Sequence, residues 1–340
     1  MSDFAHKYDP GVQVAADDAL CLHRNENLFV SRAWTVDTAR DLVERASIGS
    51  YPDANSDALR VGLAKLYGVE RENIFVGNGS DEVLADLLSI LRPKYDSVHC
   101  LDACFKVYDM LAERMDFQQK VLPGNTFETG HVDSEGFRGL AVVDSPNALT
   151  GRSVPRDEIL ALASHPDSFL IWDNVYGEYS GDQLPAPPAN NTVYVRSFSK
   201  YYALAGLRVG YCIGPAGLIS EMLARKDVFN VNCFAQVMAL EALNRQGEFE
   251  ALRDQLVACR TVLIERLRAL GFEVPPTDYV AVLATHPKYT AEFLQAELLA
   301  RQVVVRRFPG EVTSNFIRIT VAPTETMEKF LAILTEIVGS

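Results

Sequence analysis

The sequence predicts an α/β fold, with a large domain built on a mixed sheet and a smaller C-terminal α+β domain. Short segments that are apolar on both faces alternate with segments whose apolar residues recur at helical spacing. Strands of that kind belong to sheets that helices cover on both sides. The pattern changes near residue 235, where longer amphipathic segments begin. A chain of 340 residues has room for two domains of about 150 residues each.

The first elements surround a glycine-rich turn. Residues 56–68 predict a helix that a glycine ends, and residues 73–76 predict a short strand. This strand leads into the turn 77–82, and residues 83–91 carry apolar side chains at helical spacing, so a second helix is expected with Ser80 as its N-cap. Further strands are expected at 97–101, 140–143, 169–172 and 193–195, with helical segments between them.

The C-terminal part predicts three helices and three short strands. The helices are expected at about 249–270, at about 290–301 and at the end of the chain up to residue 338, and the strands at 272–274, 303–305 and 315–321. We therefore divide the chain into an N-terminal arm (1–34), a large domain (35–235) and a small domain (236–340).

Composition narrows the class of partner. The chain carries 32 Lys and Arg against 45 Asp and Glu, a net charge of −13, which disfavours nucleic acid and anionic membranes as partners. No apolar run is long enough to span a bilayer, and the first seven residues lack a signal-peptide pattern. The six cysteines and six histidines show no metal-ligand spacing, so no metal is expected. We expect a soluble, cytoplasmic protein.

Two loops resemble known motifs but lack their remaining parts. The turn at Gly77 and Gly79 follows a strand and opens a helix, as phosphate sites do. It has neither the third glycine of a dinucleotide fingerprint nor the lysine of a P-loop, so NAD and ATP are disfavoured. Residues 197–200 match the Ser-x-x-Lys of β-lactamases, but the later Lys-Thr-Gly strand is missing.

A lysine and a carboxylate follow two of the apolar strands. Lys200 stands in a serine-flanked turn after the strand at 193–195, with Arg208 eight residues further on. Such a lysine is suited to hold an aldehyde cofactor as a Schiff base, while hydroxyl groups and an arginine bind its phosphate. Asp173 ends another strand and could keep a pyridinium nitrogen protonated, and Tyr176 could reach the phenolic oxygen of such a ring.

Taken together, these residues resemble a family. The segments 79–82, 173–176, 197–200 and 203–210, with Asn25–Asn27, 50–53 and 317–320, are similar to fold-type I pyridoxal-phosphate enzymes of the class I/II aminotransferase group. The most similar members are the histidinol-phosphate aminotransferases. The resemblance covers nearly the whole chain and is most specific from the Ser-x-Ser-Lys turn to Gly206-Leu207-Arg208.

The resemblance implies roles for individual residues. Lys200, Asp173 and Tyr176 would be catalytic, with Lys200 binding pyridoxal 5'-phosphate covalently. Phe105 would stack on the ring, and Tyr51 would reach the cofactor of the other subunit of a homodimer. The phosphate would be bound by Ser80, Asp81, Ser197, Ser199 and Arg208, and a small-molecule amine substrate by Arg318, Asn27 and Arg306.

One turn departs from the family pattern. Ala148 and Leu149 stand where the family has the asparagine that bonds the phenolic oxygen, and the proline after it. Whether Asn147 replaces that asparagine is open. The change predicts an altered substrate, with histidinol phosphate itself a poor one. We expect an aminotransferase that uses a 2-oxo acid acceptor; the alternatives are a lyase, decarboxylase or cyclase on the same scaffold, or a non-catalytic binding protein.

Overall fold

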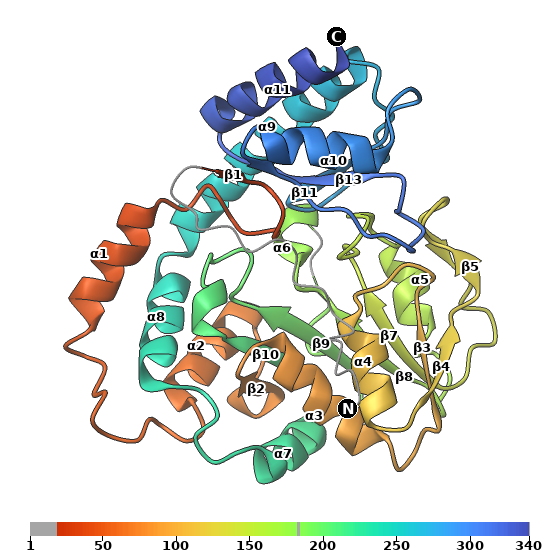
Figure 1. Cartoon of the computed structure of the whole chain (residues 1–340). Coiled ribbons are helices and arrows are strands. Elements are labelled where there is room, and N and C mark those ends of the chain that lie inside the picture. Colours follow the sequence, from red (N-terminus) through yellow and green to blue (C-terminus); the bar gives the residue numbers. More distant parts are fainter. Residues whose placement is uncertain (1–18, 182–183, 340) are drawn as a thin grey trace, which may run out of the picture.

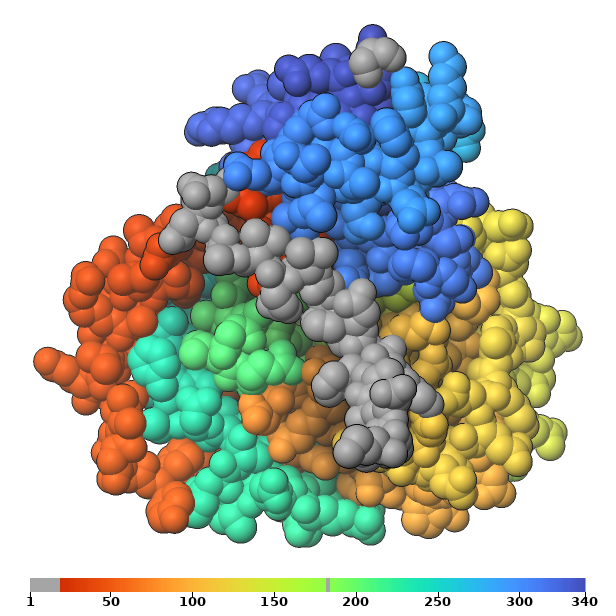
Figure 2. Space-filling view, in the orientation of Figure 1, coloured from red at the N-terminus to blue at the C-terminus, as the bar shows by residue number. Residues whose placement is uncertain are grey.

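The structure is a computed structural model that describes residues 19–181 and 184–339. The first part of the predicted arm and the N-terminal residues without a signal pattern lie outside the described residues. The described residues form two bodies, which Figures 1 and 2 show as a broad lower body and a smaller blue body above it.

A seven-stranded mixed sheet forms the centre of the lower body. Its strand order is β2-β10-β9-β8-β7-β3-β4, and only β10 runs antiparallel to its neighbours in this sheet. The strands are β2 (Ile74–Gly77), β3 (Ser97–Cys100), β4 (Gln118–Val121), β7 (Leu140–Asp144), β8 (Phe169–Asp173), β9 (Thr192–Ser197) and β10 (Gly210–Ile213). The predicted α/β class is therefore confirmed for this part of the chain.

Helices cover both faces of the sheet because its strands are apolar on both sides. In β8, Phe169 and Ile171 pack on one face, while Leu170 and Trp172 pack on the other. The first face is covered by α3 (Ser80–Leu91), α4 (Val107–Arg114) and α7 (Ala216–Arg225). The second is covered by α2 (Asp57–Tyr67), α5 (Arg156–Ala161), α8 (Cys233–Asn244) and α9 (Gln246–Ala269).

The upper body contains the C-terminal elements. Strands β11 (Ala281–Ala284) and β13 (Ile317–Thr320) pair antiparallel, and they lie beside α9, α10 (Ala291–Ala300) and α11 (Thr324–Val338) (Figure 1). Strand β1 (Leu20–Cys21) of the predicted arm pairs with β12 (Val303–Val304), so the arm joins the upper body. The boundary that we predict at residue 235 falls within α8, and the three-part division stays a prediction.

The remaining elements are short. They are α1 (Arg32–Leu42), α6 (Gly177–Ser180), the 3-10 helices Arg71–Asn73 and Ala205–Leu207, and the hairpin of β5 (Gly124–Asn125) and β6 (His131–Val132). Within residues 19–181 and 184–339, no helix has both the length and the apolar character that crossing a membrane requires.

Glycines end the two longest predicted helices at the expected places. Gly68 and Gly271 follow α2 and α9 with φ of 65° and 87°, in the left-handed region that favours glycine. The prediction for the helix after the glycine-rich turn was wrong by one residue. Gly79, with φ 87°, is the N-cap of α3, and Ser80 is its first helical residue.

Candidate active site

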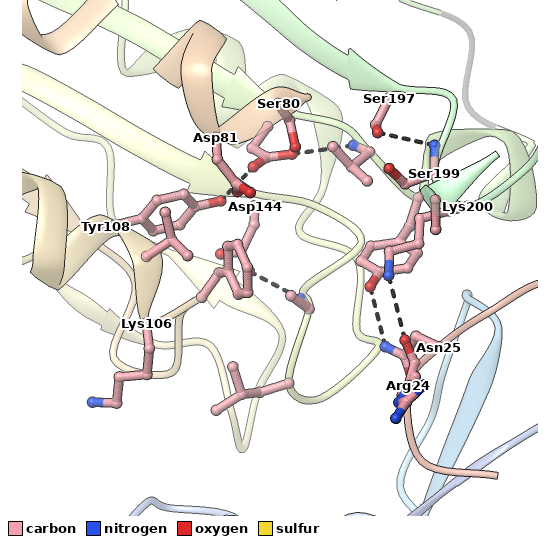
Figure 3. A pocket seen from close by; sticks show the side chains of 18 of the residues that line it. Arg24, Asn25, Ser80, Asp81, Lys106, Tyr108, Asp144, Ser197, Ser199 and Lys200 are labelled. Carbon is pink, nitrogen blue, oxygen red and sulfur yellow. Dashed lines mark hydrogen bonds between the residues drawn. The ribbon is translucent and has the colours of Figure 1, made fainter. Parts of the chain in front are cut away.

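A cavity of about 550 Å³ opens at the carboxyl ends of the parallel strands, between the sheet and the upper body; Figure 3 shows side chains that line it. It is lined by residues that follow β7, β8 and β9, by the start of α3, by the loop before α4 and by residues around β13. Ligands in open α/β sheets bind at this edge, because the loops there are free to carry functional side chains. Most of the predicted site residues line it, and Asn27 and Tyr51 do not.

Lys200 follows β9 by three residues, which places its side chain at the cavity. Its Nζ donates to the carbonyl of Arg24 at 3.4 Å and lies 5.7 Å from the ring centre of Tyr176. The turn that carries it is held by Ser197, whose hydroxyl accepts from the backbone N–H of Ser199 at 3.0 Å (Figure 3). Lys200 is therefore fixed on a rigid turn, and Ser197 and Ser199 line the same wall.

The start of α3 and Arg208 lie together at the cavity. The Arg208 guanidinium donates to the Asp81 carboxylate at 2.7 Å, and Ser80 and Asp81 occupy the first turn of the helix. Arg208 adopts φ 54°, which is uncommon for a residue other than glycine and is typical of functional sites. A Cβ at Gly79 would lie 2.5 Å from Nη2 of Arg208, so a side chain there would displace the guanidinium. Backbone N–H groups at a helix start and a guanidinium together favour a phosphate.

Asp173 ends β8, lines the cavity and is 6% exposed. Burial raises its pKa to about 6, although the hydroxyl of Tyr108, which donates to its Oδ2 at 2.7 Å, lowers the pKa. Phe105 lines the cavity nearby, and its ring meets that of Tyr108 edge to face at 5.9 Å. Sequence reasoning missed Tyr108, since its position one turn after Phe105 indicated only an apolar helix face.

Of two asparagines in the N-terminal segment, Asn25 lines the cavity and Asn27 does not. Asn27 is buried outside the cavity, where its Nδ2 donates to the Tyr201 carbonyl at 2.8 Å and its Oδ1 accepts from the N–H of Phe29. Both ends of the Asn27 amide are therefore engaged within the fold, and its contact with substrate stays a prediction. Asn25 lines the cavity instead and donates to the hydroxyl of Tyr176 at 3.1 Å.

The turn after β7 keeps its altered residues at the cavity. Ala148 and Leu149 line it, whereas Asn147 does not. The Asn147 amide donates to the Ala103 carbonyl at 2.6 Å and accepts from the N–H groups of Leu149 and Thr150. Both ends of the Asn147 side-chain amide are thus engaged in hydrogen bonds within the chain.

Two arginines face each other at the upper edge of the cavity. Arg306 and Arg318 form an antiparallel bridge, so their side chains project from the same side, and they are 9% and 8% exposed. Their guanidinium carbons lie 5.0 and 4.8 Å from the ring centre of Phe308. Arg318 also donates to the carbonyls of Ala148 (2.9 Å) and His23 (3.2 Å), which ties the upper body to the turn after β7.

Tyr51 does not line this cavity in the single chain. Its ring stacks on Phe229 at 4.5 Å, and its side chain is 82% exposed. In the described part of the chain, no group of three or more His, Cys, Asp or Glu side chains is arranged to hold a metal ion.

The side chains of the cavity fit pyridoxal phosphate. A buried carboxylate, a lysine and a phosphate-binding helix start converge on one space, and the buried Arg318 Nε has no partner among the described residues. These are the groups that the cofactor requires for its ring nitrogen, its aldehyde and its phosphate.

Comparisons with known proteins agree with this geometry. The family "Aminotransferase class I and II" matches residues 17–334. A histidinol-phosphate aminotransferase of Thiobacillus denitrificans is 34% identical over 323 residues, covering 92% of this chain and 90% of that protein.

Solved structures share the fold. The histidinol-phosphate aminotransferase of Sinorhizobium meliloti in complex with pyridoxal-5'-phosphate has a TM-score of 0.83 at 21% identity, covering 94% of this chain and 91% of that chain. The L-threonine-O-3-phosphate decarboxylase of Porphyromonas gingivalis has a TM-score of 0.82 at 23% identity, covering 94% and 100%. The family match and the curated relative confirm the predicted resemblance: the chain belongs to the class I and II aminotransferases and is a pyridoxal-phosphate-dependent aminotransferase of fold type I.

Proposed function

We propose that the cavity holds pyridoxal phosphate between Lys200, Asp173 and Arg208. The observation that carries this assignment is their convergence on one cavity from three separate positions in the sheet. The proposed site comprises Lys200, Asp173 and Tyr176 as catalytic residues, Phe105 against the ring, and Ser80, Asp81, Ser197, Ser199 and Arg208 around the phosphate. The bound cofactor supplies an electron sink for bonds at the α carbon of the substrate.

Each of these side chains then has a task that its surroundings support. Asp173 holds a negative charge toward the ring nitrogen, helped by the hydrogen bond from Tyr108. Lys200 Nζ, once the substrate has displaced it, moves the proton at the substrate α carbon. Tyr176 presents a hydroxyl that Asn25 already holds by a 3.1 Å hydrogen bond.

The proposed substrate is an amine that carries a dianion such as a phosphate monoester. Arg306 and Arg318 are partners in an antiparallel bridge, so both guanidinium groups project from the same side and line the cavity. A phosphate monoester has enough acceptor oxygens to accept charge-assisted hydrogen bonds from both. The curated relative of Thiobacillus denitrificans is named for such a substrate, histidinol phosphate. Ala148 and Leu149 line the cavity in place of the family's asparagine and proline, so we still predict that histidinol phosphate itself is a poor substrate.

We further propose a homodimer. Exposed apolar side chains gather around Tyr51: Ile48 is 70%, Val228 is 65% and Phe229 is 42% exposed. Exposed apolar patches mark interaction surfaces, among them contacts with another protein chain. In the dimer, Tyr51 reaches the phosphate of the partner's cofactor. The cytoplasmic location stays a prediction.

A panel of amine donors tests this function. Each donor is offered with 2-oxoglutarate, and the panel pairs a phosphorylated amine with its dephosphorylated form and with a carboxylate analogue. We expect formation of glutamate, with higher kcat/KM for the phosphorylated donors. Loss of carbon dioxide or of a β substituent without consumption of the 2-oxo acid would overturn the proposal, and efficient turnover of histidinol phosphate would overturn the prediction drawn from the turn.

A further inference from the structure

A second carboxyl group stands beside Asp173 that the proposed function does not use. Asp144 ends β7 as Asp173 ends β8, and the two residues are partners in the register of these parallel strands. Residues paired in this way project from the same side of a sheet, and both side chains line the cavity. The two carboxyl groups are therefore neighbours at the end of the cavity that faces the ring nitrogen.

Asp144 is buried and only partly satisfied. It is 2% exposed, and its Oδ2 accepts from the N–H of Ala148 at 2.9 Å. Its Oδ1 is fully buried and has no hydrogen-bond partner among the described residues. Burying a carboxylate costs free energy when one of its oxygens accepts no hydrogen bond. A protonated carboxyl group carries no charge and has an O–H that can donate.

The groups around Asp144 do not favour a second negative charge. They come from β8, the turn after β7, the loop before α4, α4 itself and the residue before α6: Asp173, Asn147, Ala148, Cys104, Tyr108 and Tyr176. Each of these is neutral or anionic, and the cation Arg318 is linked to Asp144 through Ala148, whose carbonyl accepts from it. Burial, the largest effect, and the carboxylate of Asp173 raise the pKa of Asp144, whereas hydrogen bonds from the N–H of Ala148, from its own backbone and from the Asn147 side chain lower it; the resulting pKa is about 7.

We propose that Asp144 is a positioning residue that works as a neutral carboxyl group, so that the pair Asp144–Asp173 carries one negative charge and Asp173 holds it. The proposal rests on the proposed function, because it assumes that Asp173 faces the cofactor nitrogen. One charge matches one pyridinium, and a second would remain without a partner in a buried site.

The same carboxyl group also supports the substrate arginine. Its Oδ2 accepts from the N–H of Ala148, and the carbonyl of Ala148 accepts from Arg318 at 2.9 Å. Asp144 thus connects the end of the cavity that holds the ring nitrogen to the guanidinium that is proposed to bind the anion. An asparagine at 144 keeps the acceptor and stays neutral, whereas an alanine removes the acceptor.

This difference gives a matched pair of variants. We compare wild type, Asp144→Asn and Asp144→Ala as apoproteins, unfolding each in urea at pH 5 and at pH 8.5 at one protein concentration. Since Asp144 ionises in wild type between these values and cannot in either variant, the unfolding constant of wild type rises relative to Asp144→Asn by on the order of 100-fold. In the loaded enzyme, Asp144→Ala raises KM for the anionic donor more than Asp144→Asn does.

Infrared spectroscopy of the wild type provides a readout that does not depend on Asp144→Ala folding. At pH 6, in apoprotein and in the loaded enzyme, the wild type shows the C=O stretch of a protonated carboxyl that Asp144→Asn lacks. Absence of this band, or an unfolding constant with the same pH dependence in wild type and Asp144→Asn, overturns the proposal. An equal rise in KM in the two variants overturns the connection to Arg318. Failure of the donor panel would instead count against the proposed function, since the apoprotein measurements need no substrate.

Discussion

Replacing Arg318 by lysine separates its role in the fold from its role toward an anionic substrate. Two of its N–H groups already donate to the carbonyls of Ala148 and His23, and the guanidinium lies 4.8 Å from the ring centre of Phe308. Three further N–H groups remain for a ligand. Lysine keeps the positive charge but is a point charge, and it cannot hold two carbonyls and an anion in the same geometry.

The size of the effect follows from these contacts. Loss of one hydrogen bond between a charged group and an anion in a buried site costs about 1.5–3 kcal/mol. This corresponds to a fall of about 10- to 150-fold in kcat/KM for a donor with an anionic group, chiefly through KM. Arg318→Ala removes the charge as well and leaves two carbonyls without their donor, so its cost is about 2–5 kcal/mol and includes a loss of stability.

Steady-state kinetics with paired donors measure this effect. The phosphorylated amine and its dephosphorylated form are compared in wild type and Arg318→Lys, with Arg307→Lys as control, because Arg307 lies outside the cavity and contacts Glu292 and Gln295. We expect the loss with Arg318→Lys for the phosphorylated donor only, and less than about a threefold change with Arg307→Lys. An equal loss for both donors would refute the reasoning, since it would show that lysine disturbs the fold and not the anion contact.

Three more predictions concern the cofactor end and the second subunit. Asp173→Ala lowers kcat, because it raises the activation free energy by several kcal/mol, whereas Phe105→Leu raises it by about 1 kcal/mol. Comparable losses of kcat in the two variants would show that Asp173 is not the partner of the ring nitrogen. Tyr108→Phe raises the pKa of Asp173 above its value of about 6 by about one to two units. Since a raised pKa of an acid destabilises the folded state as pH rises, the variant apoprotein is less stable than wild type mainly above pH 7, and urea unfolding with the same deficit at pH 5 and pH 8.5 would contradict this. Tyr51→Phe weakens cofactor binding about tenfold by removing one charge-assisted hydrogen bond from the partner subunit, which a fluorescence titration of apoprotein detects; unchanged affinity would remove Tyr51 from the site.

The cofactor end of the site could be predicted because its signals are local. Lys200 follows a strand within a serine-flanked turn, and Asp173 ends an apolar strand, so each is visible in a few neighbouring residues. The sheet then brings both to one edge, since the carboxyl ends of parallel strands meet there. The helix 57–67 and the glycine after it were predictable for the same reason.

Other parts of the site depend on backbone conformation or on register. Asn25 lines the cavity and Asn27 does not, and Asn25 adopts φ 55°, a conformation that the sequence does not indicate. Asp144 gives the same strand-end signal as Asp173, but its importance comes from the register of β7 against β8, which joins residues 29 positions apart in the chain. The N-cap of α3 was misplaced because Gly79 supplies the turn by its positive φ and not by a side chain.

The most direct test of the central claim is to identify the residue that holds the cofactor. The protein is loaded with pyridoxal phosphate, reduced with borohydride and digested, and the modified peptide is sequenced by mass spectrometry. Among the lysines of residues 19–181 and 184–339, Lys200 and Lys106 line the cavity, and Lys200 is the one whose Nζ lies 5.7 Å from the ring centre of Tyr176. The pyridoxyl group is therefore expected on Lys200, and Lys200→Ala is expected to carry none. A pyridoxyl group on another lysine, such as Lys106 at the far wall of the cavity, would contradict the account.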